Sequence, residues 1–127
     1  MARLTAEDFC RGILGGLSLR GRASLSLLSV AGHAAARAAF EYLEKQELPL
    51  RLGFVINLHP IYGKSGDWTD AVRHYHQIGW LIYEGEGAYR LALPDLPFEE
   101  LLGEGIGDPE LWRDCASRFI DVFLSAR

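Results

Sequence analysis

One short stretch of this chain of 127 residues contains the residue types of a phosphate-binding loop, but its spacing differs from that of the motif. Gly63, Lys64 and Ser65 match the end of a phosphate-binding P-loop. That motif needs a glycine five positions before Gly63, where the chain has Leu58, so no glycine-rich loop can cradle a phosphate. We therefore predict no nucleotide site at this position.

The four histidines, His33, His59, His74 and His76, are the candidates for a metal site. His74 and His76 stand two apart in a segment that we predict to be helical. Residues at that spacing point about 200° away from each other and cannot easily share one ion. Neither cysteine has a cysteine or histidine close to it in the sequence. We expect histidines that lie on the surface or contact a partner, with no metal and no cofactor.

The sequence also lacks the signatures of nucleophilic catalysis. It has no G-x-S-x-G elbow and no reactive-cysteine signature. Glu84 and Glu86 are close in sequence, but both would be solvated at the tip of a predicted hairpin. A general acid needs burial or a charged neighbour to tune it. We predict that the protein is not an enzyme and acts by binding.

The composition is that of one globular domain. Hydrophobic residues make up 49% of the chain and charged residues 24%, which is ordinary for a folded, soluble domain. No apolar run approaches the ~18 residues of a membrane span, and the N-terminus lacks the basic-then-apolar order of a signal peptide. We expect a cytoplasmic protein. Cys10 and Cys115 should then be buried thiols, and the alternative is a disulfide joining the terminal helices.

The most regular pattern of the chain spans residues 67–93. Asp67 can cap a helix over 67–78, and Gly79 can end it. Two runs rich in β-forming residues follow, joined by two glycines around Glu86, which predicts a β-hairpin. The residues expected to face inward from the helix are Ala71, Val72, Tyr75 and Ile78, and Trp80 should lock the hairpin onto it.

The pattern AVxxYxxIGWL…GEGAYRLAL resembles the recognition helix and wing of the winged helix-turn-helix superfamily. The resemblance implies an α+β, mainly helical fold, with a winged-helix-like core over 32–93 and helical extensions at 1–31 and 94–127. It also implies a transcription regulator that contacts DNA. Residues 59–66 depart from the pattern, because they are longer than the turn of about three or four residues in a tight helix-turn-helix.

The segments before residue 67 give less uniform signals. Thr5 and Asp8 predict a capping box at the start of a glycine-containing helix, which must pack closely against another element. Residues 19–32 fit a strand or a helix, and we favour a helix. A clear helix follows over 32–46, and residues 49–60 fit a short helix or a strand. The expected buried stripes are Phe9, Ile13, Leu14 and Leu17 in the first helix and Ala36, Ala39, Phe40 and Leu43 in the second.

Beyond residue 93, a turn and one short helix are predicted at 94–102, followed by a loop. Asp108 and Pro109 then form a helix start, and the helix runs to about Ser125. Its apolar residues cover too much of the circumference for one packing surface. We predict that two copies of the chain pair through this helix. The alternative is a helix sandwiched between the N-terminal helix and the winged-helix-like core.

The exposed side of the 67–78 helix is the predicted binding site. Arg73 and Gln77 are side chains that can make paired hydrogen bonds with base edges. The residues predicted to bind nucleic acid or a protein partner are Lys64, Trp68, Arg73, His74, His76, Gln77 and Arg90. A second basic group would be a site for an acidic partner or simply surface charge, and it comprises Arg11, Arg20, Arg22 and Arg37.

Charge weighs against DNA as the ligand. The chain has a net charge of −4, whereas proteins that bind nucleic acid usually carry a basic patch. The predicted wing tip is acidic, at Glu84 and Glu86, where a DNA-binding wing would carry Lys or Arg. Asp67 and Asp70 add to these acids. The alternative is therefore a protein–protein interaction module that acts on the transcription or replication machinery, with Tyr62 among its contacts.

Overall fold

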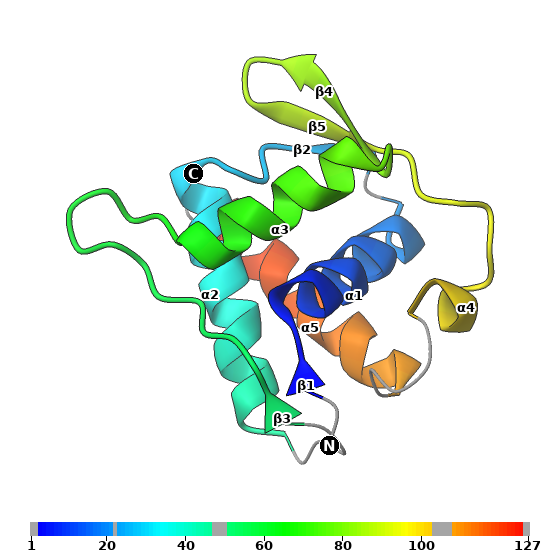
Figure 1. The fold of residues 1–127 in the computed structure, drawn as a ribbon, viewed down its shortest axis with the longest axis horizontal. Coiled ribbons are helices and arrows are strands. Elements are labelled where there is room, and N and C mark those ends of the chain that lie inside the picture. Colours follow the sequence, from blue (N-terminus) through cyan, green and yellow to red (C-terminus); the bar gives the residue numbers. More distant parts are fainter. Residues whose placement is uncertain (1–2, 22, 47–50, 103–107, 126–127) are drawn as a thin grey trace.

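The fold is that of a computed structural model, which describes residues 3–21, 23–46, 51–102 and 108–125. Within these ranges, five helices and two small sheets form an α+β fold that is mainly helical, as predicted (Figure 1). The elements are β1 (Arg3–Leu4), α1 (Ala6–Leu19), β2 (Ser24–Leu25), α2 (Val30–Glu44), β3 (Arg51–Leu52), α3 (Gly66–Gln77), β4 (Leu81–Gly85), β5 (Ala88–Leu91), α4 (Phe98–Leu102) and α5 (Pro109–Ser125).

Helix α5 lies within the helical body and packs against both α1 and α2 (Figure 1). Its buried rings reach the other helices, because Trp112 contacts the ring of Phe9 and Phe119 contacts the ring of Trp68. The short helix α4 also packs against α1 and α5. The wide apolar surface of α5 is thus used within one chain. The homodimer stays a prediction, but the feature that suggested it has an intramolecular explanation.

Helix α1 begins with the predicted capping box. The Thr5 hydroxyl accepts from the Asp8 N–H (3.1 Å), and the Asp8 carboxylate accepts from the Thr5 N–H (3.0 Å). The glycines in this helix permit the close packing that was predicted. A Cβ on Gly12 would overlap the ring of Trp112, and a Cβ on Gly16 would overlap the side chain of Ala116. The predicted stripe of Phe9, Ile13, Leu14 and Leu17 is fully buried.

Helix α2 begins at Val30, slightly before the predicted start, because the Ser29 hydroxyl caps it by accepting from the Gly32 N–H (3.1 Å). The predicted buried stripe of Ala36, Ala39, Phe40 and Leu43 is confirmed. On the outward side, Arg37 donates to the Glu41 carboxylate at 2.8 Å. The same guanidinium donates to the Ile56 carbonyl at 2.6 Å, so α2 also holds the segment that follows β3.

Two predictions for the segments around α2 are wrong or incomplete. Residues 24–25 form strand β2, not the favoured helix, because they pair with β5 at Ser24–Arg90 and Leu25–Tyr89. Residues 51–52 form strand β3, which pairs in parallel with β1 and favours the strand over the short helix. Residues 53–65 contain no helix, so the connection to α3 is a long loop.

Helix α3 and the hairpin agree with the prediction in most respects. Gly79 ends the helix in the left-handed region, at φ +85°, and Gly87 takes φ +81° in the hairpin turn. Strands β4 and β5 pair in antiparallel register, and the sheet order is β2–β5–β4. Tyr75 is fully buried and Trp80 is partly buried against it, with their rings 5.1 Å apart. Ile78 was predicted to face inward but is 51% exposed, because it lies beyond the last turn of the helix.

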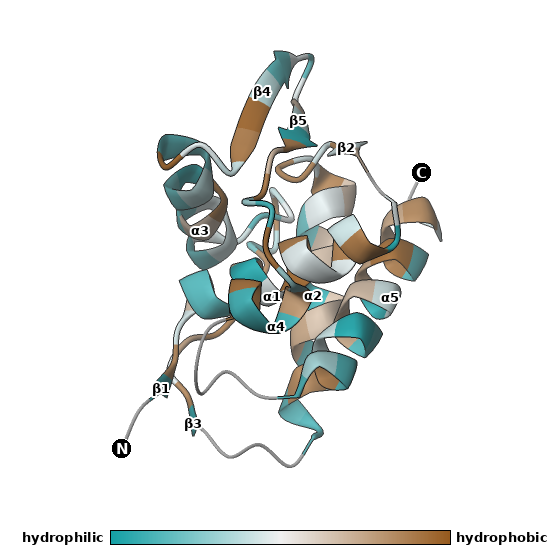
Figure 2. Ribbon diagram, turned by 90° about the vertical axis from the view of Figure 1, so that its right-hand side faces the viewer, coloured by the Kyte–Doolittle hydropathy of each residue, from teal (hydrophilic) through white to brown (hydrophobic). Residues whose placement is uncertain are grey.

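Strand β2 changes where the winged-helix-like part would begin. It precedes residue 32, yet it forms the third strand of the sheet that contains the hairpin. The core is also continuous, since buried residues of α1, α2, α3 and α5 belong to one cluster. Figure 2 shows the hairpin of β4 and β5 projecting from this helical body.

Both cysteines are buried free thiols, which is the favoured of the two predictions. Burial raises the pKa of Cys115 to about 12 and also raises the pKa of Cys10, with nearby carboxylates acting in the same direction. None of the described helices is both long enough and apolar enough to cross a membrane.

The start of α3 is held by a buried polar contact with α2. Ser65, not Asp67, is the N-cap, and its hydroxyl accepts from the Trp68 N–H at 3.3 Å. The Ser65 N–H in turn donates to Nδ1 of His33 at 3.0 Å. Asp67 lies in the first turn, where its negative charge interacts favourably with the positive end of the helix dipole. The imidazole of His33 therefore positions the N-cap residue of the helix.

We expect Gly16→Ala to lower the free energy of unfolding and Gly66→Ala to leave it unchanged or raise it. Alanine gains up to ~1 kcal/mol of helix propensity over glycine. At Gly16 the added Cβ would overlap Ala116 and force α1 and α5 apart, at a typical overpacking cost of ~1–3 kcal/mol. At Gly66 no atom lies within 4 Å of the added Cβ. Urea denaturation measures both variants, and a midpoint for Gly16→Ala at or above that of Gly66→Ala would contradict the packing.

A second prediction concerns pH. Burial, and then the Lys64 charge, lower the pKa of His33 from 6.5 to about 4. The unfolded chain therefore binds a proton here that the folded chain does not. The free energy of unfolding should fall as the pH drops from 6.5 to 4, by on the order of 3 kcal/mol from this group.

His33→Asn tests this dependence, because the asparagine carbonyl can accept from Ser65 without titrating. Urea denaturation at both pH values should give a smaller loss of stability for His33→Asn than for the wild type. His76→Asn replaces an exposed histidine and should keep the wild-type loss. An equal loss of stability in all three proteins would show that His33 does not cause the pH dependence.

Candidate functional site

The outward side of α3 carries a line of polar residues. The helix buries Trp68, Ala71, Val72 and Tyr75, which lie on one side of it. Asp70, Arg73 and Gln77 follow one another at i, i+3 and i+7 on the opposite side, and all three are exposed. The burial of one side of the helix thus leaves this line facing solvent. It contains two of the predicted site residues, Arg73 and Gln77.

The two histidines of α3 lie on opposite flanks of this line. His74 is half-buried, with its ring 5.0 Å from that of Tyr75. His76 is exposed and packs edge-on against Tyr89 of the hairpin at 5.6 Å. They do not converge, as their spacing predicted. Among the described residues, no cluster of histidine, cysteine or acidic side chains could hold a metal ion.

Trp68 is not a surface residue, which corrects the prediction that it binds a partner. Its side chain is fully buried, and the indole N–H donates to the Leu27 carbonyl at 2.9 Å. Its ring also contacts Phe9 and Phe119. Lys64 precedes the helix and is exposed, as predicted. Of these two residues, only Lys64 is free to meet a ligand.

Charged side chains of the hairpin contact other side chains of the chain. Arg90 lies 3.5 Å from Glu84, and Glu84 also accepts from the Ser24 hydroxyl at 2.8 Å, which ties β2 to the hairpin. Glu86 is at the tip, with φ +53°. Among the described residues, the charged side chains beside α3 that have no such partner are two cations, Lys64 and Arg73, and three acids, Asp67, Asp70 and Glu86. The surface is close to neutral and slightly acidic.

The second basic group does not form one patch. Arg11 donates to the Tyr75 hydroxyl at 3.1 Å, and Tyr75 donates to the Glu7 carbonyl, which joins α1 to α3. Burial raises the pKa of Tyr75 to about 12, although Arg11 acts in the opposite direction. Arg20 donates to Ser117 of α5 at 2.7 Å, and Arg37 holds the 53–65 loop. Arg22 lies outside the described residues.

Arg11, Arg20 and Arg37 are therefore structural contacts between separate elements. Each guanidinium donates to a hydroxyl or a carbonyl of another part of the chain. The sequence placed them together only because they are close along the chain. The prediction of a single site for an acidic partner at these residues does not fit the structure.

A groove beside α3 is lined by His76 and by residues that were not predicted to belong to a site, among them Tyr83 and Tyr89. It has a volume of about 480 Å³ and lies between the end of α3, the hairpin and the β2–α2 turn. Tyr83 and Tyr89 form a cross-strand pair with rings 5.3 Å apart, and His76 and Glu86 also line the groove. The alternation of side chains along a strand could have indicated the position of Tyr83, because Leu81 and Tyr83 point to the same face of the sheet.

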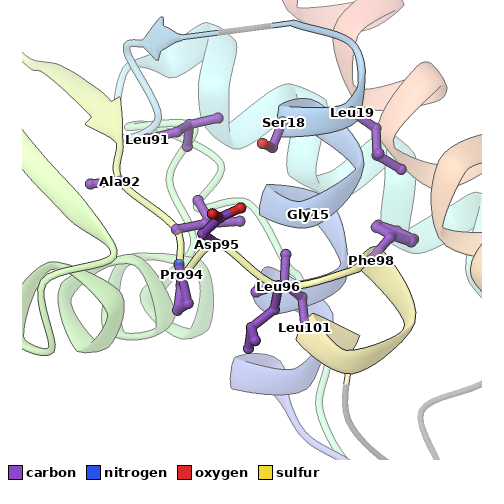
Figure 3. Close-up of a pocket in the computed structure, with 11 residues that line it drawn as sticks. Gly15, Ser18, Leu19, Leu91, Ala92, Pro94, Asp95, Leu96, Phe98 and Leu101 are labelled. Atoms are coloured by element: carbon purple, nitrogen blue, oxygen red, sulfur yellow. The ribbon is translucent and has the colours of Figure 1, made fainter.

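A second cavity, of about 310 Å³, lies between α1 and the segment that joins β5 to α4. Figure 3 shows its lining, in which the carboxylate of Asp95 and the hydroxyl of Ser18 are the polar side-chain groups among leucine, proline and phenylalanine. Gly15 is at its wall, and a Cβ there would come within 3.0 Å of the Phe98 ring. This cavity contains none of the predicted site residues.

The surface formed by α3 and the hairpin offers single charges, hydrogen-bonding groups and aromatic rings. Arg73 and Gln77 can donate to a ligand, Lys64 can meet an anion, and Tyr83 presents an exposed ring. These groups suit binding contacts along an extended surface. Comparisons of the chain with models of protein families, with curated proteins and with solved structures found no match.

Proposed function

We propose that this chain is a non-enzymatic, cytoplasmic regulatory protein that contacts DNA through a winged-helix-like arrangement of α3 and its hairpin. The observation that carries the proposal is the exposed line of Asp70, Arg73 and Gln77 on α3, next to a projecting hairpin (Figure 2). A helix that passes through one glycine into a hairpin is also the feature that resembles the winged helix-turn-helix superfamily.

The order of the elements supports this proposal. Helix α1 and strand β2 precede α2 and α3, and β2 pairs with the second strand of the hairpin. The winged-helix-like unit would then run from α1 to β5, and α4 and α5 would be its extension. The long 53–65 loop separates α2 from α3, so the two helices do not form a tight helix-turn-helix.

In this proposal, α3 meets the groove of a duplex with its outward line. Arg73 and Gln77 would contact base edges, to which arginine and glutamine can make paired hydrogen bonds. Lys64, immediately before the helix, would meet a phosphate, which fixes position without reading sequence. The hairpin would lie along the backbone with Glu86 at its tip, where an acid opposes binding.

The charges limit the strength of such a contact. Arg90 is engaged with Glu84, so few cations remain for phosphates. The one phosphate that Lys64 would neutralise implies a slope of about −0.9 when the logarithm of affinity is plotted against that of salt concentration. Binding should therefore be weak and easily screened. Specificity would come from Arg73 and Gln77.

Glu86→Lys should tighten binding to any duplex, because a lysine at the hairpin tip would meet backbone phosphate. Arg73→Ala should instead weaken the preference at one base position, by ~1–3 kcal/mol. Fluorescence anisotropy of labelled random duplex at low ionic strength measures the first effect, and a set of defined duplexes measures the second.

Glu44→Lys is the matched control for Glu86→Lys. It makes the same change in net charge at the exposed end of α2. Equal tightening by both variants would mean that only net charge matters and that α3 and the hairpin are not the site. No binding by the wild type or by Glu86→Lys at low salt would reject DNA. The alternative, a protein partner on the same surface, would then replace it.

A further inference from the structure

The loop before α3 presents the two most exposed large apolar side chains of the described residues. Ile61 is 79% exposed and Tyr62 is 68% exposed. Val30, at the start of α2, is also exposed, and its Cγ1 lies 3.6 Å from the Cβ position of Gly63. Figure 1 shows the segment between β3 and α3 looping out to one side of the molecule. An apolar patch on a projecting loop is typical of an interaction site.

Residues 59–64 form a compact turn built by four hydrogen bonds. The His59 N–H donates to the Lys64 carbonyl at 2.9 Å, and the Gly63 N–H donates to the His59 carbonyl at 2.8 Å. The N–H groups of Ile61 and Tyr62 donate to Nδ1 of His59, at 3.1 and 3.3 Å. The Tyr62 ring packs on the His59 ring at 4.8 Å. The turn thus holds the two apolar side chains outward.

Both ends of the loop are fixed to α2. Arg37 donates to the Ile56 carbonyl on the side that follows β3, and Ile56 is fully buried. On the other side, His33 accepts from the Ser65 N–H. A partner would therefore meet a turn whose backbone is already ordered, and binding would cost less conformational entropy.

The charge of this loop differs from that of the chain as a whole. Residues 53–66 contain no aspartate or glutamate, whereas the chain has a net charge of −4. Lys64 is exposed next to Tyr62, and His59 is exposed at the base of the turn. An apolar patch with a cationic edge complements an apolar segment that carries carboxylates.

We propose that the 59–64 turn docks an acidic, apolar segment of a partner protein, with Ile61 and Tyr62 in an apolar contact and Lys64 facing a carboxylate. Tyrosine is a frequent anchor at protein interfaces. A phosphodiester backbone would match Lys64 but offers no apolar surface to Ile61. Lys64 can face either the carboxylate or the phosphate of the proposed DNA contact, so the acidic segment and a duplex would compete for it. A second copy of this chain is less suitable than an acidic partner because the same turn would bring two cations together.

The test uses a displayed library of short random peptides, selected on the full chain. Enriched peptides should combine aspartate or glutamate with leucine or an aromatic residue. One enriched peptide is then synthesised with a fluorescent label, and its affinity for the protein is measured by fluorescence anisotropy. The peptide should bind the Ile61→Ser variant, and the Lys64→Glu variant, about tenfold or more weakly than it binds the wild type. Ile61→Ser leaves the hydrogen bonds of the turn in place, because they involve its backbone N–H.

Ile82→Ser with Leu124→Ser is the control, because it removes two exposed aliphatic side chains elsewhere and should keep the affinity. Selection of peptides without acids, or equal affinity for wild type and Ile61→Ser, would overturn the proposal. A loss of duplex binding in Ile61→Ser would assign the turn to DNA instead. A wild-type dimer that Ile61→Ser converts to a monomer would assign it to a second copy.

Discussion

The burial of Trp68 determines how α3 is presented. Its indole is enclosed by Phe9 of α1 and Phe119 of α5, and its N–H is satisfied by the Leu27 carbonyl. A buried indole N–H without an acceptor would cost ~1–3 kcal/mol, so the hydrogen bond fixes the rotation of α3 as well as its position. With Trp68 inside, the line of Arg73 and Gln77 must face outward.

A second constraint is the way in which buried or half-buried polar groups hold the loops. His33 and Arg37 project from α2 and bind the backbone at both ends of the segment that precedes α3. Arg11 likewise joins α1 to α3 through the Tyr75 hydroxyl. These side chains satisfy backbone or hydroxyl groups that packing has removed from water. The charges of Arg11 and Arg37 are therefore used for architecture and are less available to a ligand.

Local signals predicted the elements that depend on local interactions. The capping box at Thr5, the end of α3 at Gly79 and the hairpin are decided within a few residues, and all are present. Strand β2 was missed because its pairing with β5 joins residues that are far apart in the sequence. Trp68 was misplaced for a related reason. A tryptophan next to the start of a helix fits the surface or the core equally well until α1 and α5 are in place.

The candidate site was predicted only in part, because exposure depends on tertiary partners. Arg73 and Gln77 are exposed since Tyr75 and Val72 are buried, and helical periodicity conveys that relation directly. No periodicity conveys that Arg90 is held by Glu84 across the hairpin, or that residues 59–64 close into a turn around the imidazole of His59. Internal packing determines two features of the surface: which charged side chains of α3 stay exposed, and which apolar side chains of the turn stay exposed. The first leaves the α3 surface nearly neutral, so in the proposed contact with DNA the specificity would come from polar contacts by Arg73 and Gln77. The second places Ile61 and Tyr62 on an ordered backbone, where apolar contact is obtained at a small entropic cost.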